Sequence, residues 1–487
     1  MMSEKENKPI DPVQDFISTS KVELADKEDY RNSIATVDAD GKRIWMYPKK
    51  PSGNFYNARS IFSWFLLAFL FGAPFIEVNG HPLILLNVLE RKFVLFGIVF
   101  WPQDFHLFAL ALLTFAVFII LFTVVFGRVF CGWACPQTVF LEMVFRKIEY
   151  FIEGDAPRQR ALNKAPWTAS KIAKKTSKHI IFYALSFLIG NIFLAYIIGV
   201  DALTKIITDP PSEHIAGLTA MLVFSTMFYG VFSWFREQAC VIVCPYGRLQ
   251  SVLLDQNSIV VSYDFMRGEP RGHRKRGLDH SNLGDCVDCT LCVQVCPTGI
   301  DIRNGTQLEC VNCTACIDAC NQIMDKVEKP RGLIRYSSYN GIEQSEKLRM
   351  TPRIAGYSLV LVLLLSSLSF LLANRTPVET TILRTPGLLY QSLDNGVIQN
   401  LYSLQIVNKS SEEREISLHL QEINGQLIMV GGGKSLQVKG EGLLERAFFI
   451  QIPESELSST STKLQLEVRD GDKVLDVIQT AFAGPTR

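Results

Sequence analysis

The sequence CVDCTLCVQVCP, at residues 286–297, spaces four cysteines as CxxCxxCxxxC, and CVNCTACIDAC, at 310–320, repeats that spacing. Such closely spaced thiolates can grip the irons of a metal–sulfur cluster only from a tight, turning loop. The chain has 487 residues and twelve cysteines, all of them between residues 131 and 320. A disulfide scaffold would spread its cysteines through exported parts of a protein. The clustering therefore favours metal ligation or redox chemistry.

The doubled spacing is the two-cluster bacterial ferredoxin pattern, in which the fourth cysteine of each run ligates the other cluster. We therefore expect two [4Fe–4S] clusters, with the ligand sets Cys286, Cys289, Cys292 and Cys320 for one, and Cys296, Cys310, Cys313 and Cys316 for the second. Structural zinc is the alternative, but zinc knuckles use paired CxxC units with a longer spacer. Cys320 is followed by asparagine where the usual run has proline, which bears on turn geometry more than on ligation.

Two further cysteine pairs follow apolar runs. RVFCGWACPQ, at 128–137, and FREQACVIVCPYG, at 235–247, each place a CxxxCP motif shortly after an arginine. Each motif closes a two-helix unit, so residues 61–135 and 180–244 have the form of an internal repeat. Cysteines four apart share one face of a helix, and the proline is expected to end that helix after the second cysteine.

The repeat predicts that four thiols lie together at one face of the membrane: Cys131, Cys135, Cys240 and Cys244. Soft thiolates select Cu(I), zinc or iron–sulfur clusters. The four thiols could instead cycle between dithiol and disulfide. The plainest alternative is that they are small buried side chains without a function, as many free cysteines are.

Five runs have the length that a bilayer requires, about 20 apolar residues. They lie at 61–76, 105–126, 180–200, 215–235 and 354–373, in a chain that is 48% hydrophobic. A sixth candidate, 82–101, is interrupted by charges at 90–92. Charges are unfavourable in the middle of a membrane helix, so this segment is expected to be an extramembrane hairpin or an interfacial segment.

The loop charges predict the orientation. The 128–178 loop carries ten lysines and arginines, the 77–104 loop two, and the 201–214 loop one. The positive-inside rule then places the N-terminus, 128–178 and 236–353 in the cytoplasm. Five spans leave the C-terminal segment on the outer side of the membrane. The formal net charge of +1 gives no indication of a nucleic-acid partner.

Residues 374–487 change character. Hydrophobic residues alternate along several short stretches, the pattern of half-buried strands, and Asp470-Gly471 is typical of a hairpin turn. We expect an immunoglobulin-like β-sandwich here. The predicted domains are a mostly flexible cytoplasmic tail (1–58), a four-span core (59–254), a ferredoxin-like domain (255–330), a linker (331–353), a fifth span (354–373) and the β-domain (374–487).

Haem is the other cofactor to consider in a membrane redox protein. The sequence contains no CxxCH motif, which excludes covalent c-type haem on motif grounds. His106 and His214 lie near the outer ends of two predicted spans and could pair as haem ligands. Histidines satisfied at the membrane interface are the favoured interpretation.

Several stretches together resemble one family, the cytochrome c oxidase accessory proteins called CcoG, FixG or RdxA, which are membrane polyferredoxins. They are GWACPQ, CPYGRLQS, the double ferredoxin run, FVLFGIVFWPQDF at 93–105 and RTPGLLYQSLDNGVIQNLYSLQIVNKS at 384–410. The resemblance covers nearly all of the chain after the N-terminal tail.

The resemblance implies reduction of Cu(II) to Cu(I) in support of assembly of the cbb3-type oxidase. It implies that the eight ferredoxin cysteines ligate clusters and that the two CxxxCP pairs handle copper. A cytoplasmic electron donor is then required, and oxidase subunits or copper-delivery factors are expected to bind the C-terminal domain. Two alternatives stay open: a NapH-like quinol dehydrogenase subunit, which would lack the fifth span and the β-domain, and a non-catalytic scaffold or redox sensor.

Overall fold

The computed structural model of the chain describes residues 35–485, apart from 39, 79, 89–91, 274–281, 346–349, 386, 388–389, 394–395, 411, 422, 434 and 458. Most of the predicted N-terminal tail, residues 1–34, lies outside this range. The described residues form two compact units. The first runs to Glu90 and resumes over Ala109–Leu365, and the second combines Arg91–Phe108 with Ser366–Arg487.

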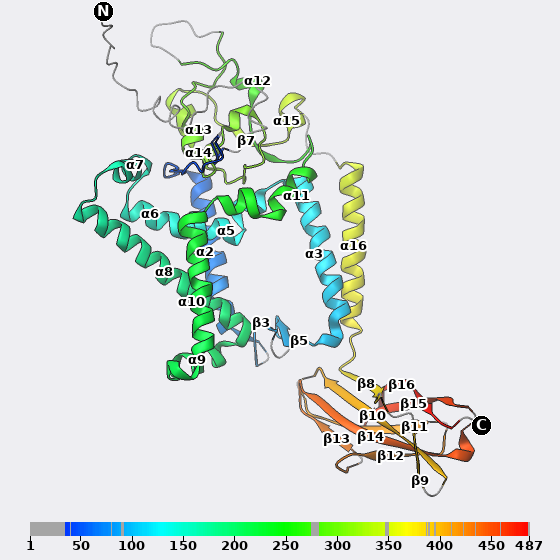
Figure 1. Cartoon of the computed structure of the whole chain (residues 1–487). Coiled ribbons are helices and arrows are strands. Elements are labelled where there is room, and N and C mark those ends of the chain that lie inside the picture. The colour runs from blue at the N-terminus through cyan, green and yellow to red at the C-terminus, as the bar shows by residue number, and fades with distance from the viewer. Residues whose placement is uncertain are drawn as a thin grey trace, which may run out of the picture. The chain divides into compact units, whose positions relative to one another are not determined.

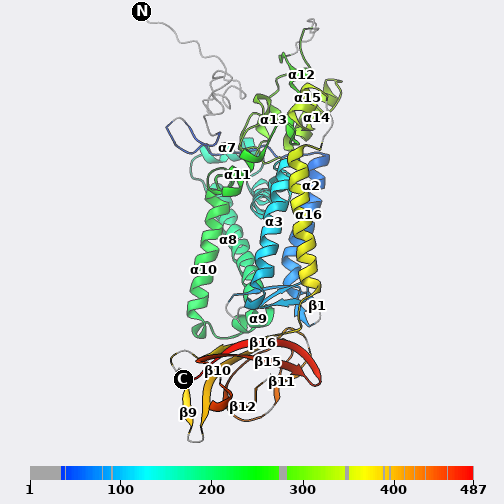
Figure 2. The ribbon, with the colours of Figure 1, turned by 90° about the vertical axis from the view of Figure 1, so that its right-hand side faces the viewer.

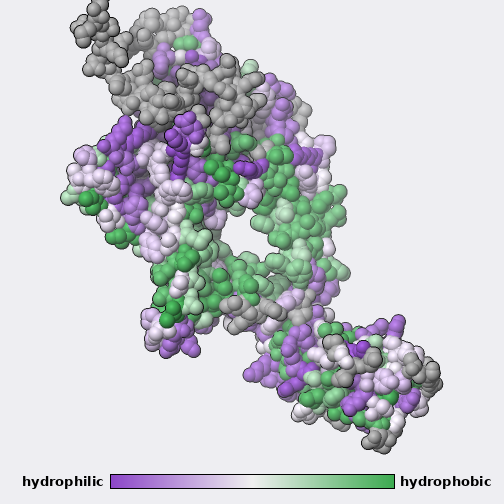
Figure 3. Space-filling view, in the orientation of Figure 1, coloured by the Kyte–Doolittle hydropathy of each residue, from purple (hydrophilic) through white to green (hydrophobic). Residues whose placement is uncertain are grey.

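Five helices in the described part of the chain are long and apolar enough to cross a membrane, as predicted. They are α2 (Asn54–Gly72, extended by a 3₁₀ turn to Phe75), α3 (Phe105–Phe126), α8 (Ala169–Ile198), α10 (Ile215–Gly230, continued by a π-helix, η6, over Val231–Phe235) and α16 (Pro352–Ala373). Figures 1 and 2 show these helices, and Figure 3 shows hydrophobic residues along α3, α10 and α16. Many of these side chains are exposed, among them Phe115, Met227 and Leu363. Exposed apolar faces of this kind suit a lipid environment.

Short elements connect the spans. They are α4 (Val129–Trp133), α5 (Pro136–Thr138), the π-helix η4 (Val139–Phe145), α6 (Arg146–Ile152), α7 (Ala156–Lys164), α9 (Val200–Thr208), the π-helix η7 (Ala239–Val243) and α11 (Pro245–Leu253). Between α2 and α3 the chain forms short strands, β1 (Glu77–Val78), β2 (His81–Pro82), β3 (Ile84–Asn87), β4 (Lys92–Leu95) and β5 (Ile98–Phe100). The segment 82–101 is therefore not a sixth membrane helix.

Aromatic packing joins the membrane helices of the first unit. Phe145 of η4 stacks on Phe232 of η6 with ring centroids 4.7 Å apart, and Phe182 of α8 meets the edge of Phe145 at 4.8 Å. All three side chains are buried. Aromatic pairs of this kind contribute roughly 0.5–1.5 kcal/mol each beyond the area that they bury. They hold the end of the second two-helix unit against the segment that follows the first.

The ferredoxin-like region contains α12 (Phe265–Gly268), α13 (Leu291–Gln294), α14 (Ala315–Lys326) and α15 (Tyr339–Glu343). Strand β6 (Val260–Tyr263) pairs with β7 (Ile334–Ser337) in an antiparallel ladder. The structure thus draws one boundary differently from the sequence prediction. The first half of the 331–353 segment, predicted as a linker, completes a sheet of this domain, because its residues are the pairing partner of β6.

The described residues of the N-terminal arm, 35–38 and 40–53, are packed against the rest of the first unit, so this part of the chain is not the flexible tail that was predicted. Arg43 donates to Glu237 at 2.8 Å, and the backbone N–H of Lys49 donates to the carbonyl of Gln294 at 2.8 Å. Tyr150 donates to the carbonyl of Pro48 at 3.1 Å. The arm therefore contacts both the ferredoxin-like region and the loop after the first CxxxCP motif.

The second unit contains a sandwich of two antiparallel sheets. One sheet has the order β12-β14-β10-β8 with β9 beside β10, and the other has β13-β11-β15-β16. The strands are β8 (Val378–Arg384), β9 (Gln391–Leu393), β10 (Val397–Asn408), β11 (Arg414–Gln421), β12 (Gln426–Met429), β13 (Ser435–Val438), β14 (Leu443–Pro453), β15 (Ser461–Asp470) and β16 (Lys473–Ala483).

The alternating residues of these strands form the core that the sequence predicted. Tyr402, Leu404 and Ile406 of β10 are fully buried together with Ile416 of β11 and Leu466 of β15. The hairpin prediction is confirmed as well, since Asp470 and Lys473 pair across a turn in which Gly471 has a φ of 58°. A positive φ at that position favours glycine.

A buried carboxylate ties the start of α3 to the β-sandwich within the second unit. Asp104 accepts from Arg375 at 2.5 Å and from Lys409 at 2.6 Å, and Lys409 also donates to Glu379 at 2.6 Å. Burial alone would raise the pKa of Asp104, but the hydrogen bonds from Arg375 and Lys409 outweigh it and hold this pKa below the ordinary value of 3.8.

We expect Asp104→Asn to lower the melting temperature at pH 7 and to lower it less at pH 3. The lowered pKa means that the ion pairs stabilise the folded state fully above about pH 4, and that this contribution is lost as the pH falls through the folded-state pKa. Melting curves of parent and variant between pH 3 and pH 7 test this. A melting-temperature difference that stayed constant across the range would contradict it.

Candidate metal centre

The two cysteine loops of the ferredoxin-like region have the same backbone geometry. In the loop of Cys286–Cys292, Asp288 and Thr290 have φ values of 55° and 54°. In the loop of Cys310–Cys316, Asn312 and Thr314 have values of 52° and 65°. Positive φ is unfavourable for residues with a side chain and marks functional turns. Turns that mix right- and left-handed residues gather backbone N–H groups into concavities that suit iron–sulfur sites.

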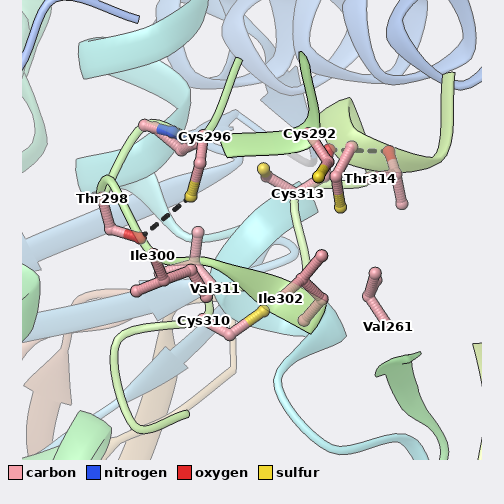
Figure 4. Close-up of a pocket in the computed structure, with 12 residues that line it drawn as sticks. Val261, Cys292, Cys296, Thr298, Ile300, Ile302, Cys310, Val311, Cys313 and Thr314 are labelled. Atoms are coloured by element: carbon pink, nitrogen blue, oxygen red, sulfur yellow. Dashed lines mark hydrogen bonds between the residues drawn. The ribbon is translucent and has the colours of Figure 1, made fainter. Parts of the chain in front are cut away.

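The structure gathers each predicted ligand set around one cavity. Cys296, Cys310, Cys313 and Cys316 line one cavity, together with Cys292. Figure 4 shows several of these thiols around it, with Cys296 bonded to the Thr298 hydroxyl at 3.4 Å. We call this the Cys313 cavity. Its thiols are the ligands that an iron–sulfur cluster requires.

A second cavity is lined by the other predicted set, Cys286, Cys289, Cys292 and Cys320. We call it the Cys289 cavity. Cys320 lies inside α14, where a following proline would break the helix, and this explains the asparagine at 321. The Asn321 side chain instead accepts from the backbone N–H of Gly332 at 2.9 Å. The asparagine in place of the usual proline therefore affects helix α14 and leaves the set of cysteine ligands unchanged.

Seven of the eight cysteines of the two cavities are buried or half-buried, and Cys289 is exposed. Burial raises the pKa of Cys310 to about 12, of Cys313 to about 11 and of Cys320 to about 12. Such thiols stay protonated at neutral pH until a metal takes the place of the proton. Metal loading at these cavities should therefore release protons.

The two CxxxCP motifs also share one geometry. In each, a residue with positive φ stands four positions before the first cysteine, Gly127 at 55° and Arg236 at 54°. The N–H of the second cysteine donates to the carbonyl five residues earlier at 2.9 Å, in both Cys135 and Cys244. Both of these cysteines are extended and precede the proline that begins the next helix. These features support the internal repeat at the level of the backbone.

This geometry changes one expectation. The cysteines of a pair do not share one face of a continuous helix, because the second cysteine of each pair has left the helix. The following proline is the cause, since its ring disfavours the helical conformation for the residue before it. The expectation that the proline ends the helix is confirmed.

The four thiols interact with one another. Burial raises the pKa of Cys131 to about 12, with Cys135 and Cys244 adding to the effect and Arg128 opposing it. Burial also raises the pKa of Cys240 to about 12, and the other three thiols add to the effect. Cys131 donates to the side-chain oxygen of Gln250, on α11, at 3.1 Å. The structure therefore places four thiols close enough to affect one another's ionisation: Cys131, Cys135, Cys240 and Cys244.

A buried network of charges supports the second motif, and sequence reasoning missed it. Arg236 donates to both carboxylate oxygens of Glu149, at 3.0 and 2.9 Å, and Lys178 lies 3.5 Å from the same group. Glu237 pairs with Arg146 at 3.4 Å. All five side chains are buried or nearly so. The arginine before the motif was the available sequence signal, but spacing could not identify its partners.

One of the two histidines considered as haem ligands, His214, has a carboxylate partner. His214 lies 3.0 Å from Asp209. His214, Asp209 and Glu213 form a group whose possible metal-ligand atoms all lie within 4.8 Å of one another. Among the described residues, it is the one such group of three or more His, Cys, Asp or Glu side chains. The group is partly exposed. No three of the twelve thiols meet that spacing.

Comparison with known proteins identifies the family. RdxA of Cereibacter sphaeroides is 34% identical over 458 residues, covering 88% of this chain and 94% of that protein. The chain belongs to the FixG/RdxA family. RdxB of the same organism is 33% identical, covering 88% of this chain and 93% of that protein, and the nitrogen fixation protein FixG of Rhizobium meliloti is 32% identical, covering 91% and 93%.

Family models match three regions of this FixG/RdxA-family protein. A 4Fe-4S dicluster domain matches residues 235–339, a 4Fe-4S binding domain matches 108–155, and the immunoglobulin-like fold at the C-terminus of FixG, a putative oxidoreductase, matches 368–485. The solved structure of a FixG-related protein from Vibrio parahaemolyticus is 19% identical, covers 22% of this chain and 97% of that chain, and has a TM-score of 0.20. The chain is thus an iron–sulfur redox protein with five candidate membrane spans and an immunoglobulin-like C-terminal domain.

Proposed function

We propose that this protein is a membrane-bound oxidoreductase that reduces Cu(II) to Cu(I). The observation that carries the proposal is the presence, in one compact unit, of two four-cysteine cavities and a third group of four thiols from the CxxxCP motifs. The first two would each hold a [4Fe–4S] cluster, which supplies one-electron chemistry when bound. The third group offers soft ligands, which favour Cu(I) over Cu(II).

Preferential binding of Cu(I) by these thiols raises the reduction potential of bound copper and makes its reduction easier. Because no three of the thiols lie within 4.8 Å of one another, three or four of them would have to draw together to bind a single copper ion. A metal ion that binds Cys131 and Cys240 would displace the protons of these two thiols. The residues of the chain thus bind the product ion and release protons, and the electrons come from a cytoplasmic donor.

The wider role follows from the family. We propose that the protein lies in the bacterial inner membrane with its ferredoxin-like region in the cytoplasm and its β-domain in the periplasm, in agreement with the loop charges. Its Cu(I) would support assembly of a cbb3-type oxidase, and the β-domain, which contains no cysteine, would bind oxidase subunits or copper-delivery factors. The fifth candidate span and the FixG-type domain argue against the NapH-like alternative, because a NapH-like subunit would lack both.

The test uses anaerobically purified protein, chemically reduced and mixed with Cu(II) and a Cu(I)-specific chelator. The parent should produce the Cu(I) chelate. Cys131→Ser and Cys240→Ser should lower both copper binding and cupric reduction while the iron content stays near normal, because these thiols are assigned to copper. Normal copper reduction in both variants would contradict the assignment, and loss of iron would show that the pairs hold a cluster.

A further inference from the structure

The two cavities differ in what surrounds their cysteine loops. The loop of Cys286 contacts other residues of the ferredoxin-like region. The N–H of Gly272 donates to the carbonyl of Cys286 at 3.2 Å, the N–H of Asp285 donates to the carbonyl of Arg267 at 3.0 Å, and Asp288 pairs with Arg303. The Cys289 cavity is therefore bounded on this side by its own domain.

The loop of Cys310 instead lies against the first CxxxCP motif. A Cβ atom placed on Gly132, between Cys131 and Trp133, would overlap the carbonyl oxygen of Val311 and lie 2.7 Å from that of Asn312. Real Cβ atoms do not approach so closely. The backbone that carries ligands of the Cys313 cavity thus touches the backbone between the two membrane-proximal thiols, and only glycine allows it.

Side chains on both sides of Gly132 fix this contact. Arg128 donates to the carbonyl of Leu308. The indole N–H of Trp133 donates to Tyr336 at 3.1 Å, and the Tyr336 hydroxyl donates to the carbonyl of Asn312 at 3.3 Å. Asn312 is 2% exposed and also accepts from the N–H of Val261 at 3.2 Å. The loop is therefore tied to the motif at three successive places.

The helix that follows this loop has a second attachment to the membrane part. Asp318, on α14, accepts from the N–H groups of Phe55 and Tyr56 at 3.2 and 2.7 Å, in the first turn of α2. A carboxylate is stabilised at a helix N-terminus by the helix dipole. Gly53, with a φ of 147°, makes room for the Asp318 side chain. The helix that carries Cys316 is thereby anchored to a candidate membrane span. Because α14 also carries Cys320, this attachment holds both cavities in place, and the difference between them rests on the Gly132 contact.

From these contacts we infer that the Cys313 cavity faces the copper-handling thiols and that electrons leave the protein's clusters from this cavity, with Gly132 as the positioning residue. The inference rests on the proposed function and adds to it the order in which electrons pass through the two cavities. Cys296, Cys310, Cys313 and Cys316 would hold the cluster that gives up one electron and is oxidised, and Cu(II) near the CxxxCP thiols would accept that electron and become Cu(I). Electron transfer slows steeply with distance, so a contact between backbones favours this cavity over the other.

Gly132→Ala tests the positioning residue. Iron, sulfide and the cluster EPR signals after dithionite reduction should stay near the parent values, while the rate of Cu(I) formation should fall severalfold. Hydrogen exchange of backbone amides over 305–316 should increase, which reports the lost contact without reference to activity. Gly217→Ala and Gly356→Ala are the matched controls, since both lie in candidate spans and a Cβ there meets no atom within 4 Å.

Two further comparisons keep the inference falsifiable if Gly132→Ala folds poorly. Trp133→Phe keeps the ring packing but removes the bond to Tyr336, and should slow Cu(I) formation less severely. Cys289→Ser should keep the cluster of the Cys313 cavity, and in reduced protein Cu(II) should reoxidise this cluster at the parent rate. Cys313→Ser should keep the cluster of the Cys289 cavity, and Cu(II) should reoxidise that cluster more slowly. Equal reoxidation rates in these two variants, or a parent rate in Gly132→Ala, would overturn the inference alone. A parent that does not reduce Cu(II) would overturn the proposed function and the inference with it.

Discussion

Glu149→Gln should destabilise the protein by about 3–5 kcal/mol, the usual consequence of removing one partner from a buried ion pair. Glu149 is 4% exposed and receives two hydrogen bonds from Arg236, which is 3% exposed. Burial alone would raise the pKa of Glu149, but Arg236, Lys178 and Arg146 outweigh it and hold this pKa below its ordinary value. The amide would leave the Arg236 guanidinium buried without its main counter-charge.

The measurement is the melting temperature in detergent at neutral pH. Asp325→Asn is the matched control, because it removes an ion pair with Arg331 of similar geometry, 2.6 Å long, from the protein surface. Exposed pairs contribute little, so this variant should melt near the parent temperature. If Glu149→Gln melted as Asp325→Asn does, the buried network would not be a support of the fold.

The double variant Glu149→Gln with Arg236→Gln should be more stable than Glu149→Gln alone, because no buried charge is then left uncompensated. The other members of the network keep partners, since Lys178 still pairs with Glu153 at 2.9 Å and Glu237 with Arg43 at 2.8 Å. Copper reduction should also fall in the single variant, because Arg236 stands four residues before Cys240 and fixes the start of the motif.

Cys289→Ser and Cys313→Ser should each remove about half of the iron and sulfide of the parent, since the proposed ligand sets place these residues in different cavities. About eight irons are expected in the parent and about four in each variant. The two variants should retain different EPR signals after reduction, one from each cavity. Cys135→Ser is the matched control, because it removes a thiol assigned to copper, and it should keep the full iron content.

Iron and sulfide analysis of anaerobically purified protein checks this prediction. Loss of both clusters in both variants would indicate that the two cavities assemble only together. Tightly bound zinc in place of iron would contradict the cluster assignment altogether.

Local patterns in the sequence predicted much of this structure. The apolar runs located all five candidate spans, because hydrophobic length is a property of a continuous segment. Alternation placed Tyr402, Leu404 and Ile406 in the β-sandwich core, since side chains alternate along a strand. The cysteine spacing predicted the two ligand sets that line separate cavities, because the ferredoxin pattern includes the exchange of the fourth cysteine.

What the sequence left open depends on contacts between distant residues. The linker prediction for 331–353 failed to anticipate β7, whose four residues form a strand only by pairing with β6. The N-terminal arm is polar and lacks periodicity, yet it is held by bonds to residues more than 100 positions away, such as Asp155 and Glu237. Gly132 is part of the CGWAC motif, but a single sequence does not show that the Val311 carbonyl occupies the space beside this glycine.

The most direct test of copper reduction is a single-turnover experiment under anaerobic conditions. Protein reduced with dithionite and freed of excess reductant is mixed rapidly with Cu(II) and a Cu(I) chelator, and cluster absorbance and chelate colour are followed together. We predict that the clusters reoxidise as the chelate forms, with one electron transferred for each copper ion reduced. Clusters that stay reduced while Cu(II) persists would contradict the account.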